Sequence, residues 1–169
     1  PLAPDVAFQL GDKEKFFQAG LDVLRKLTPG KVHLNINGQA EVPQVFAQAN
    51  GVELNKFSGP HPAGNVGVQI HHLDPISKKD IVWTVAPYGV AQIGQLFLEG
   101  KYDASKLVAV TGSEVKNPGY VKTYSGVMLE KLFGSEVPTG HLRFIAGNPL
   151  TGENCGKAGY LGYYHNQVT

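Results

Sequence analysis

The sequence predicts an α/β unit followed by a smaller α+β unit of the β-grasp type. Helical and strand-like segments alternate over residues 1–104, which is typical of a mainly parallel, Rossmann-like layer. Over residues 105–169, strand-like segments separated by a Pro-Gly turn predict a hairpin, and a short helix and a further strand follow. We therefore expect domains over 1–104 and 105–169, the first with or without the opening strand of its layer.

Hydrophobic spacing predicts the elements of residues 1–104. After an extended lead-in over 1–11, we expect Asp12 to cap a helix that ends at Leu27 and buries Phe17 and Leu21. The segment 80–85 carries apolar residues on both faces, as a strand inside a sheet does. The remaining predicted elements are strands over 31–37 and 52–57, helices over 42–49 and 62–73, and a helix from Val90 that ends at Gly100.

Residues 105–169 are expected to hold fewer and shorter elements. Strands over 106–111 and 120–124 flank the turn signal Lys-Asn-Pro-Gly at 116–119. A helix over 127–133 and a strand over 143–146 complete the predicted unit. A hairpin, a helix and a further strand in this order are what a small β-grasp unit requires.

The stretch 57–75 is the most distinctive in the chain. The stretch contains the end of a strand, then a turn with Gly59 and Gly64, then a helix. In this arrangement the positively charged N-terminal end of the helix dipole lies at the turn, where it can attract an anion. Neither G-x-G-x-x-G nor G-K-[ST] is present, so the standard phosphate fingerprints are missing. This favours a packing role, in which Gly64 and Gly67 let the helix lie close to a sheet. We therefore expect Gly64→Val to destabilise the chain more than Asn65→Ala.

For the other residues that could take part in catalysis or metal binding, the sequence predicts structural roles. His71 and His72 are adjacent and would point about 100° apart on a helix, so we predict no metal site. The sequence lacks G-x-S-x-G, and the single Cys155 has no designated partner, so we predict no catalytic residue. Trp83, Tyr88 and Phe97 are candidates for an aromatic wall, although core positions are commoner for such residues.

Composition narrows the function classes. Fifteen Lys and Arg against fourteen Asp and Glu give a net charge of +1, which argues against nucleic-acid binding. One cysteine excludes an internal disulfide and an iron–sulfur cluster built from this chain alone. No apolar run reaches the roughly 18 residues of a membrane-spanning helix. The first residue is Pro1 rather than Met, so we expect an internal fragment of a longer protein.

The motif G-P-H-P-A-G-x-x-G-x-x-I-H-x-L-D-P at 59–75 resembles the central motif of the A subunit of the bacterial sodium-translocating NADH:quinone reductase. Further pieces that fit in the same order include Gly20-Leu-Asp-Val-Leu24, Ile93-Gly-Gln-Leu-Phe97 and Tyr160-Leu-Gly-Tyr-Tyr-His-Asn-Gln-Val168. Residues 110–119 and 144–149 also resemble the soluble-ligand-binding β-grasp domains. The resemblance therefore covers nearly the whole chain.

This resemblance implies a part of a respiratory sodium pump that oxidises NADH, reduces quinone and exports sodium ions. It implies a peripheral subunit on the cytoplasmic face of the bacterial inner membrane, with the other subunits of the complex as partners. NADH, flavins, an iron–sulfur centre and quinone would be handled through other parts of the complex, and this chain would bind no cofactor. It would act as a scaffold or quinone-handling region, not catalytic by itself. From the residues themselves, the candidate contacts for a ligand or a quinone are His61, Gly64, Trp83 and Tyr88.

Two alternatives from other classes stay open at this point. One is a flavin- or nucleotide-binding oxidoreductase domain, which would need a glycine fingerprint or an acidic contact to the ribose. The other is a stand-alone β-grasp module that binds a small ligand and has no redox role.

Overall fold

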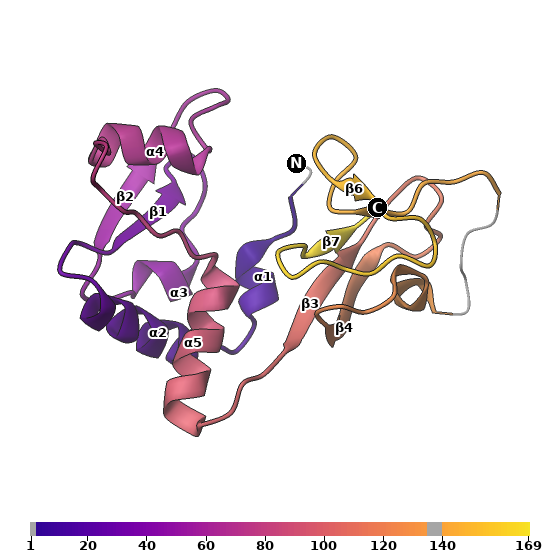
Figure 1. Ribbon diagram of the computed structural model, residues 1–169, viewed down its shortest axis with the longest axis horizontal. Coiled ribbons are helices and arrows are strands. Elements are labelled where there is room, and N and C mark those ends of the chain that lie inside the picture. Colours follow the sequence, from indigo (N-terminus) through magenta and orange to yellow (C-terminus); the bar gives the residue numbers. More distant parts are fainter. Residues whose placement is uncertain (1–2, 135–139) are drawn as a thin grey trace. The chain divides into compact units, whose positions relative to one another are not determined.

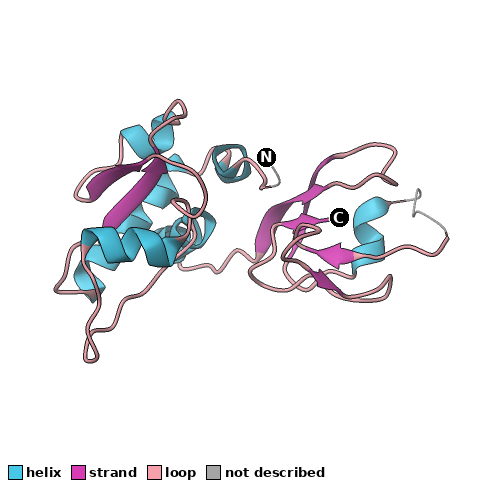
Figure 2. Ribbon diagram, turned by 90° about the horizontal axis from the view of Figure 1, so that it is seen from above, coloured by secondary structure: helices cyan, strands magenta, loops and turns pink. Residues whose placement is uncertain are grey.

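A computed structural model describes residues 3–134 and 140–169, and the chain separates into two compact units (Figures 1 and 2). The α/β unit is Leu10–Asp103. The strand-rich unit is Ala104–Thr169 together with the segment that ends at Gln9. The lead-in thus belongs to the strand-rich unit, whereas the sequence assigned it to the first. The division into domains over 1–104 and 105–169 stays a prediction.

The core of the α/β unit lies between helices α2 (Glu14–Leu27) and α5 (Pro87–Glu99), which pack against each other (Figure 1). Phe17 and Leu21 from α2 and Val90 from α5 are buried there, as the apolar spacing of α2 predicts. Lys13 and not Asp12 occupies the N-cap position of α2, and no side chain caps the helix, so the predicted Asp12 cap is wrong.

Two glycines allow the two helices to approach closely. A Cβ on Gly20 would collide with the carbonyl oxygen of Val90, and one on Gly94 would collide with that of Phe16. The backbones of α2 and α5 therefore touch where each helix has no side chain.

Strands β1 (His33–Asn37) and β2 (Glu53–Phe57) pair in parallel, with Asn35 opposite Asn55. A short helix α3 (Gln44–Ala47) lies between them in sequence, and α4 (Val66–Leu73) follows β2. None of the residues of α4 is buried. The order of helices and parallel strands agrees with the predicted α/β class, and β1 and β2 are the only strands among the described residues of this unit.

The predicted strand over 80–85 is wrong. The segment runs as an irregular connection between α4 and α5, with Trp83 86% and Ile81 81% exposed (Figure 1). A strand with apolar side chains on both faces is stable only when covered on both sides. The described part of this unit provides two strands and no second layer over this segment, so pairing would bury little.

The strand-rich unit is built on five strands in the order β4-β3-β7-β5-β6. The antiparallel hairpin of β3 (Ser105–Val110) and β4 (Gly119–Tyr124) is present as predicted, and β7 (Gln167–Val168) pairs in parallel with β3. The predicted helix over 127–133 is a 3-10 helix, η1 (Leu129–Phe133), and the predicted strand over 143–146 is reduced to β5 (Ile145–Ala146). The sequence did not predict β6 (Glu153–Asn154) or β7.

The core of this unit joins β3, η1, β5 and β7. Its buried members are apolar side chains of these elements and of the segments beside them, and Val108 and Val110 alternate with Ala109 along β3. They are Val108, Val110, Leu129, Leu132, Phe144, Ala146, Leu161 and Val168.

The lead-in is tied to this unit by α1 (Val6–Leu10), which the sequence predicted as extended. Gln9 is buried and donates from Nε2 to the carbonyl oxygens of Leu107 at 2.8 Å and Asn166 at 3.0 Å. The Phe8 and Tyr120 rings lie 4.6 Å apart. The Asp5 backbone N–H also donates to the Tyr120 hydroxyl at 2.9 Å, so hydrogen bonds and an aromatic contact fasten the segment to β3 and β4.

Candidate functional site

The turn between β2 and α4 (residues 58–65), called the motif turn below, is open rather than packed. His61 and Gly64 are both exposed, and a Cβ built on Gly64 or on Gly67 would meet no atom within 4 Å. The prediction that these glycines let α4 lie close to a sheet is therefore wrong. The turn is exposed, and α4 presents its N-terminal end there with Asn65 as an extended N-cap that makes no side-chain capping bond.

A row of side-chain amides that the sequence did not predict connects the two strands to this turn. Asn55 Nδ2 donates to Asn35 Oδ1 at 3.0 Å, and Asn35 Nδ2 donates to Gln69 Oε1 at 3.0 Å. Gln69 Nε2 reaches the carbonyl oxygens of Ala63 and Gly64 at 3.4 and 3.5 Å. The row links β1, β2 and α4 to the turn, so polar contacts take the place of apolar packing. The alternation of polar residues in both strands was the available signal.

The other two predicted contact residues lie on separate segments. Trp83 lies in the exposed connection between α4 and α5, and Tyr88 lies in the first turn of α5. The Lys13 Nζ atom lies 5.8 Å from the centre of the Tyr88 ring and also bonds Gln95 Oε1 and Asp103 Oδ2, both at 3.2 Å. Tyr88 therefore belongs to a cluster that ties α5 to the start of α2. Trp83 and Phe97 are both largely exposed, so neither is a core aromatic.

His71 and His72 are exposed neighbours whose rings lie 5.7 Å apart. Within residues 3–134 and 140–169, the structure brings together no group of three or more His, Cys, Asp or Glu side chains able to hold a metal ion.

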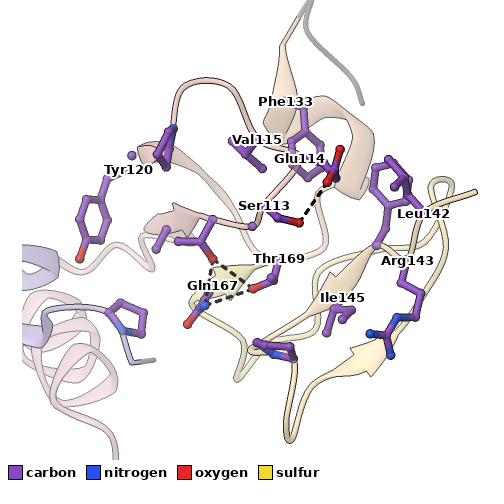
Figure 3. Close-up of a pocket in the computed structure, with 18 of the residues that line it drawn as sticks. Ser113, Glu114, Val115, Tyr120, Phe133, Leu142, Arg143, Ile145, Gln167 and Thr169 are labelled. Atoms are coloured by element: carbon purple, nitrogen blue, oxygen red, sulfur yellow. Dashed lines mark hydrogen bonds between the residues drawn. The ribbon is translucent and has the colours of Figure 1, made fainter. Parts of the chain in front are cut away.

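A hollow of about 1050 Å³ lies in the strand-rich unit, where no candidate residue was predicted (Figure 3). Strands β3, β4 and β7 form one side of it, and the segments around 112–118 and 141–145 form another. Its lining is mainly apolar and includes Pro4, Ala109, Val115, Tyr120, Phe133, Leu142 and Ile145. The volume is at the upper end of the range that small-molecule sites occupy.

Three polar side chains lie together in the wall of this hollow, and Figure 3 shows their hydrogen bonds. Gln167 is only 6% exposed and donates from Nε2 to the hydroxyl oxygens of Thr111 at 3.0 Å and Thr169 at 3.2 Å. The Thr111 hydroxyl donates to the Val168 carbonyl, and the Thr169 hydroxyl donates to that of Gly147. Thr111 follows the apolar strand β3, but Gln167 and Thr169 lie in and after a strand of two residues, so the sequence carried no pattern that could predict this cluster.

Lys106 is a buried cation on β3 whose contacts are backbone carbonyls. Its Nζ donates to the carbonyl oxygen of Tyr163 at 2.9 Å and to that of His165. Burial lowers the pKa of the Lys106 ammonium group below its ordinary value of 10.5. The side chain anchors the 163–165 segment and lies outside the lining of the hollow.

The chain has an α/β unit with an open strand–turn–helix motif and a five-stranded unit with an apolar hollow. These features place it in the class of two-unit α/β and β-grasp proteins. Residues 1–102 match the family described as the NqrA second alpha/beta domain, and residues 107–157 match the NQRA C-terminal domain. The chain therefore belongs to the NqrA family, as the motif at 59–75 predicted.

Curated relatives agree with this family. The chain is 41% identical over 170 residues to a protein of Saccharophagus degradans, 40% to one of Marinomonas and 39% to one of Vibrio atlanticus. Each is named as the A subunit of a Na(+)-translocating NADH-quinone reductase. The alignments cover 100% of this chain but only 38%, 37% and 37% of the relatives. The chain thus spans little more than a third of their length, and no helix in its described part is long and apolar enough to cross a bilayer.

Proposed function

We propose that this chain is the part of the A subunit of a sodium-translocating NADH:quinone reductase that carries its second α/β domain and the domain after it. The observation that carries the proposal is the match over the full length of the chain to relatives with that name, together with both domain matches in the same order. In this role the chain is a scaffold and quinone-handling region of a sodium pump and holds no redox centre of its own. NADH, flavins and the iron–sulfur centre are then used through other parts of the complex.

The exposed connection between α4 and α5 supports a role in assembly. Ile76, Ile81, Val82 and Trp83 are all exposed within eight consecutive residues (76–83). Three of these residues, Ile81, Val82 and Trp83, are consecutive, and exposed apolar residues that lie together mark interaction sites more often than isolated ones do. We infer that other subunits of the pump cover this connection and that the chain is held at the cytoplasmic face of the bacterial inner membrane as part of a peripheral subunit.

Quinone handling is proposed at the motif turn and the connection that follows α4. His61 and Gly64 present an imidazole ring and open backbone, and Trp83 presents an exposed ring face. Tyr88 adds a second ring at the start of α5. An aromatic ring binds a planar headgroup through stacking, which requires ring faces that solvent or ligand can reach.

A titration separates this proposal from a flavin- or nucleotide-binding oxidoreductase domain. The chain has one tryptophan, so its fluorescence reports on the environment of Trp83 alone. We expect a short-chain quinone to quench this fluorescence saturably, and FMN and NADH to produce no saturable change after correction for their absorbance. Saturable binding of FMN or NADH at micromolar concentration would contradict the proposal and favour the oxidoreductase domain.

The hollow favours a second candidate, a β-grasp module that binds a small ligand. It has the size and apolar lining of a ligand site, and it contains a buried polar cluster. The same titration distinguishes the two when it is repeated with Trp83→Ala, followed by calorimetry because the fluorophore is removed. Quinone binding that survives Trp83→Ala with unchanged affinity assigns the ligand to the hollow and not to the connection.

A further inference from the structure

We propose that the hollow of the strand-rich unit binds a planar ring that carries a hydrogen-bond donor and, given the proposed function, that this ring is the reduced quinone, a quinol. The site is assigned from Gln167, whose amide is fixed by two hydroxyls and whose oxygen is left for a ligand. The identification of the ring as a quinol rests on the proposed function; the preference for a donor does not.

The hydrogen bonds around Gln167 decide which end of the amide faces the hollow. The hydroxyls of Thr111 and Thr169 donate to the carbonyls of Val168 and Gly147, so their oxygens are left to accept. Both accept from Gln167 Nε2, which uses the two N–H groups of that amide. The amide is therefore held in one orientation from both sides.

The remaining atom of the amide, Oε1, is an acceptor without a protein partner in the described structure. Gln167 is nine-tenths buried and lines the hollow. Figure 3 shows its oxygen turned away from the hydroxyl of Thr169. This oxygen is not among the fully buried unpaired atoms, so it can be reached from the hollow, and a ligand that supplies an O–H or N–H can bind it there.

The strand register places an aromatic ring and a small side chain beside this acceptor. Tyr120 on β4 pairs with Ala109 on β3, and Ala109 pairs with Gln167 on β7. Paired residues of neighbouring strands point to the same face, so these three form one row across the sheet. All three line the hollow, and the small Ala109 leaves room for a planar ring between the phenol of Tyr120 and the amide of Gln167.

This arrangement distinguishes the two oxidation states of a quinone. A quinol carries hydroxyl donors, whereas the oxidised ring carries only carbonyl acceptors. A quinol hydroxyl can donate to Gln167 Oε1, but a quinone carbonyl would meet another acceptor there and leave both unpaired. The hollow is therefore selective for the reduced product of the reaction over its oxidised substrate.

The test is isothermal titration of the whole 169-residue chain, without oxygen, with a short-chain quinol, the matching quinone and 4-pentylphenol. We expect the quinol and the phenol to bind about tenfold more tightly than the quinone, which corresponds to one hydrogen bond. Gln167→Met keeps the length of the side chain and removes the acceptor, so it should abolish this preference. Gln167→Glu keeps an oxygen at this position and should retain it.

Ala109→Leu provides a second variant that does not alter the polar cluster. The larger side chain fills the space beside Gln167 and should weaken all three ligands, whereas Thr123→Val on β4, which is absent from the lining, should weaken none. A thermal melt of each variant shows whether it is folded. If Gln167→Met does not fold, weaker binding to Ala109→Leu still shows whether the ligands occupy the hollow.

Equal affinities for quinol and quinone, or a preference that survives in folded Gln167→Met, would overturn the proposed site. A phenol preference that depends on Gln167, without binding of the quinol, would overturn the quinol assignment while the donor-binding site stands. Loss of the proposed pump function with intact quinol binding would count against the proposed function alone.

Discussion

Two regions of the α/β unit use glycine in opposite ways. Between α2 and α5, Gly20 and Gly94 lie where a Cβ would collide with backbone of the other helix. In the turn before α4 and at its start, Gly64 and Gly67 have no atom within 4 Å of where a Cβ would lie. The stretch that is most conspicuous in the sequence is therefore the open one, and the close helix packing lies at glycines outside that stretch. The open turn, supported by polar contacts from Gln69, is the surface at which we propose contact with a ligand or partner.

The largest expected effect is that of Gly94→Ala. The added methyl group would meet the carbonyl of Phe16 and force α2 and α5 apart, so we expect a loss of about 3 kcal/mol in the free energy of unfolding. Urea denaturation followed by circular dichroism measures it. Gly67→Ala is the matched control, because the same change within α4 meets open space and should stabilise the chain by up to about 1 kcal/mol. Equal effects of the two changes would show that the helix contact is not a close one.

Lys106→Met should have an intermediate effect and a characteristic pH dependence. The change leaves the carbonyls of Tyr163 and His165 without this donor, and we expect a loss of about 1 kcal/mol near neutral pH. Because burial lowers the pKa of Lys106 in the folded state, the unfolded chain binds more protons between that lowered pKa and 10.5. The free energy of unfolding attributable to this group therefore rises with pH through that window.

Urea denaturation of both proteins between neutral pH and 10.5 tests this sign. The difference in unfolding free energy between the parent and Lys106→Met should grow as the pH rises through the window. A difference that stays constant or shrinks over this range would contradict the assignment of a lowered pKa to Lys106.

The smallest effects are expected at the motif turn, where the sequence had predicted a large one. Gly64→Val introduces a side chain into open space, so its cost should stay within about 1 kcal/mol, which covers the conformational restriction of valine. Asn65→Ala removes an exposed side chain that makes no capping bond and should change stability by about 0.5 kcal/mol or less. Thermal melts compare the two with the parent, and a strongly destabilised Gly64→Val would restore the packing interpretation.

The sequence predicted those elements whose signal is local and repeated. The apolar face of α2 and the β3–β4 hairpin each follow from spacing within one segment. The strand over 80–85 failed because a strand with two apolar faces needs a second layer, which depends on distant parts of a protein. The two-residue strands β6 and β7 carry too short a pattern to be recognised, although β7 supplies Gln167 to the hollow.

The candidate sites were predicted less well than the fold, for a similar reason. The hollow depends on the register of β4, β3 and β7, which brings Tyr120, Ala109 and Gln167 into one row from positions far apart in the chain. His61 and Gly64 were singled out from a local motif, and their surface is open as a contact site would be. Local spacing therefore locates exposed turns, but it does not locate cavities that form only when strands pair.

The central claim, that this chain acts within the NqrA subunit of a sodium pump, is tested most directly by a chimera. These 169 residues replace the matching region of the Saccharophagus degradans relative, and sodium uptake driven by NADH is measured in inverted membrane vesicles. A control chimera carries the matching region of the Marinomonas relative. We predict that both chimeras transport sodium at rates within a few-fold of the parent complex. An assembled complex with the present chain that transports none, while the control chimera is active, would contradict the claim.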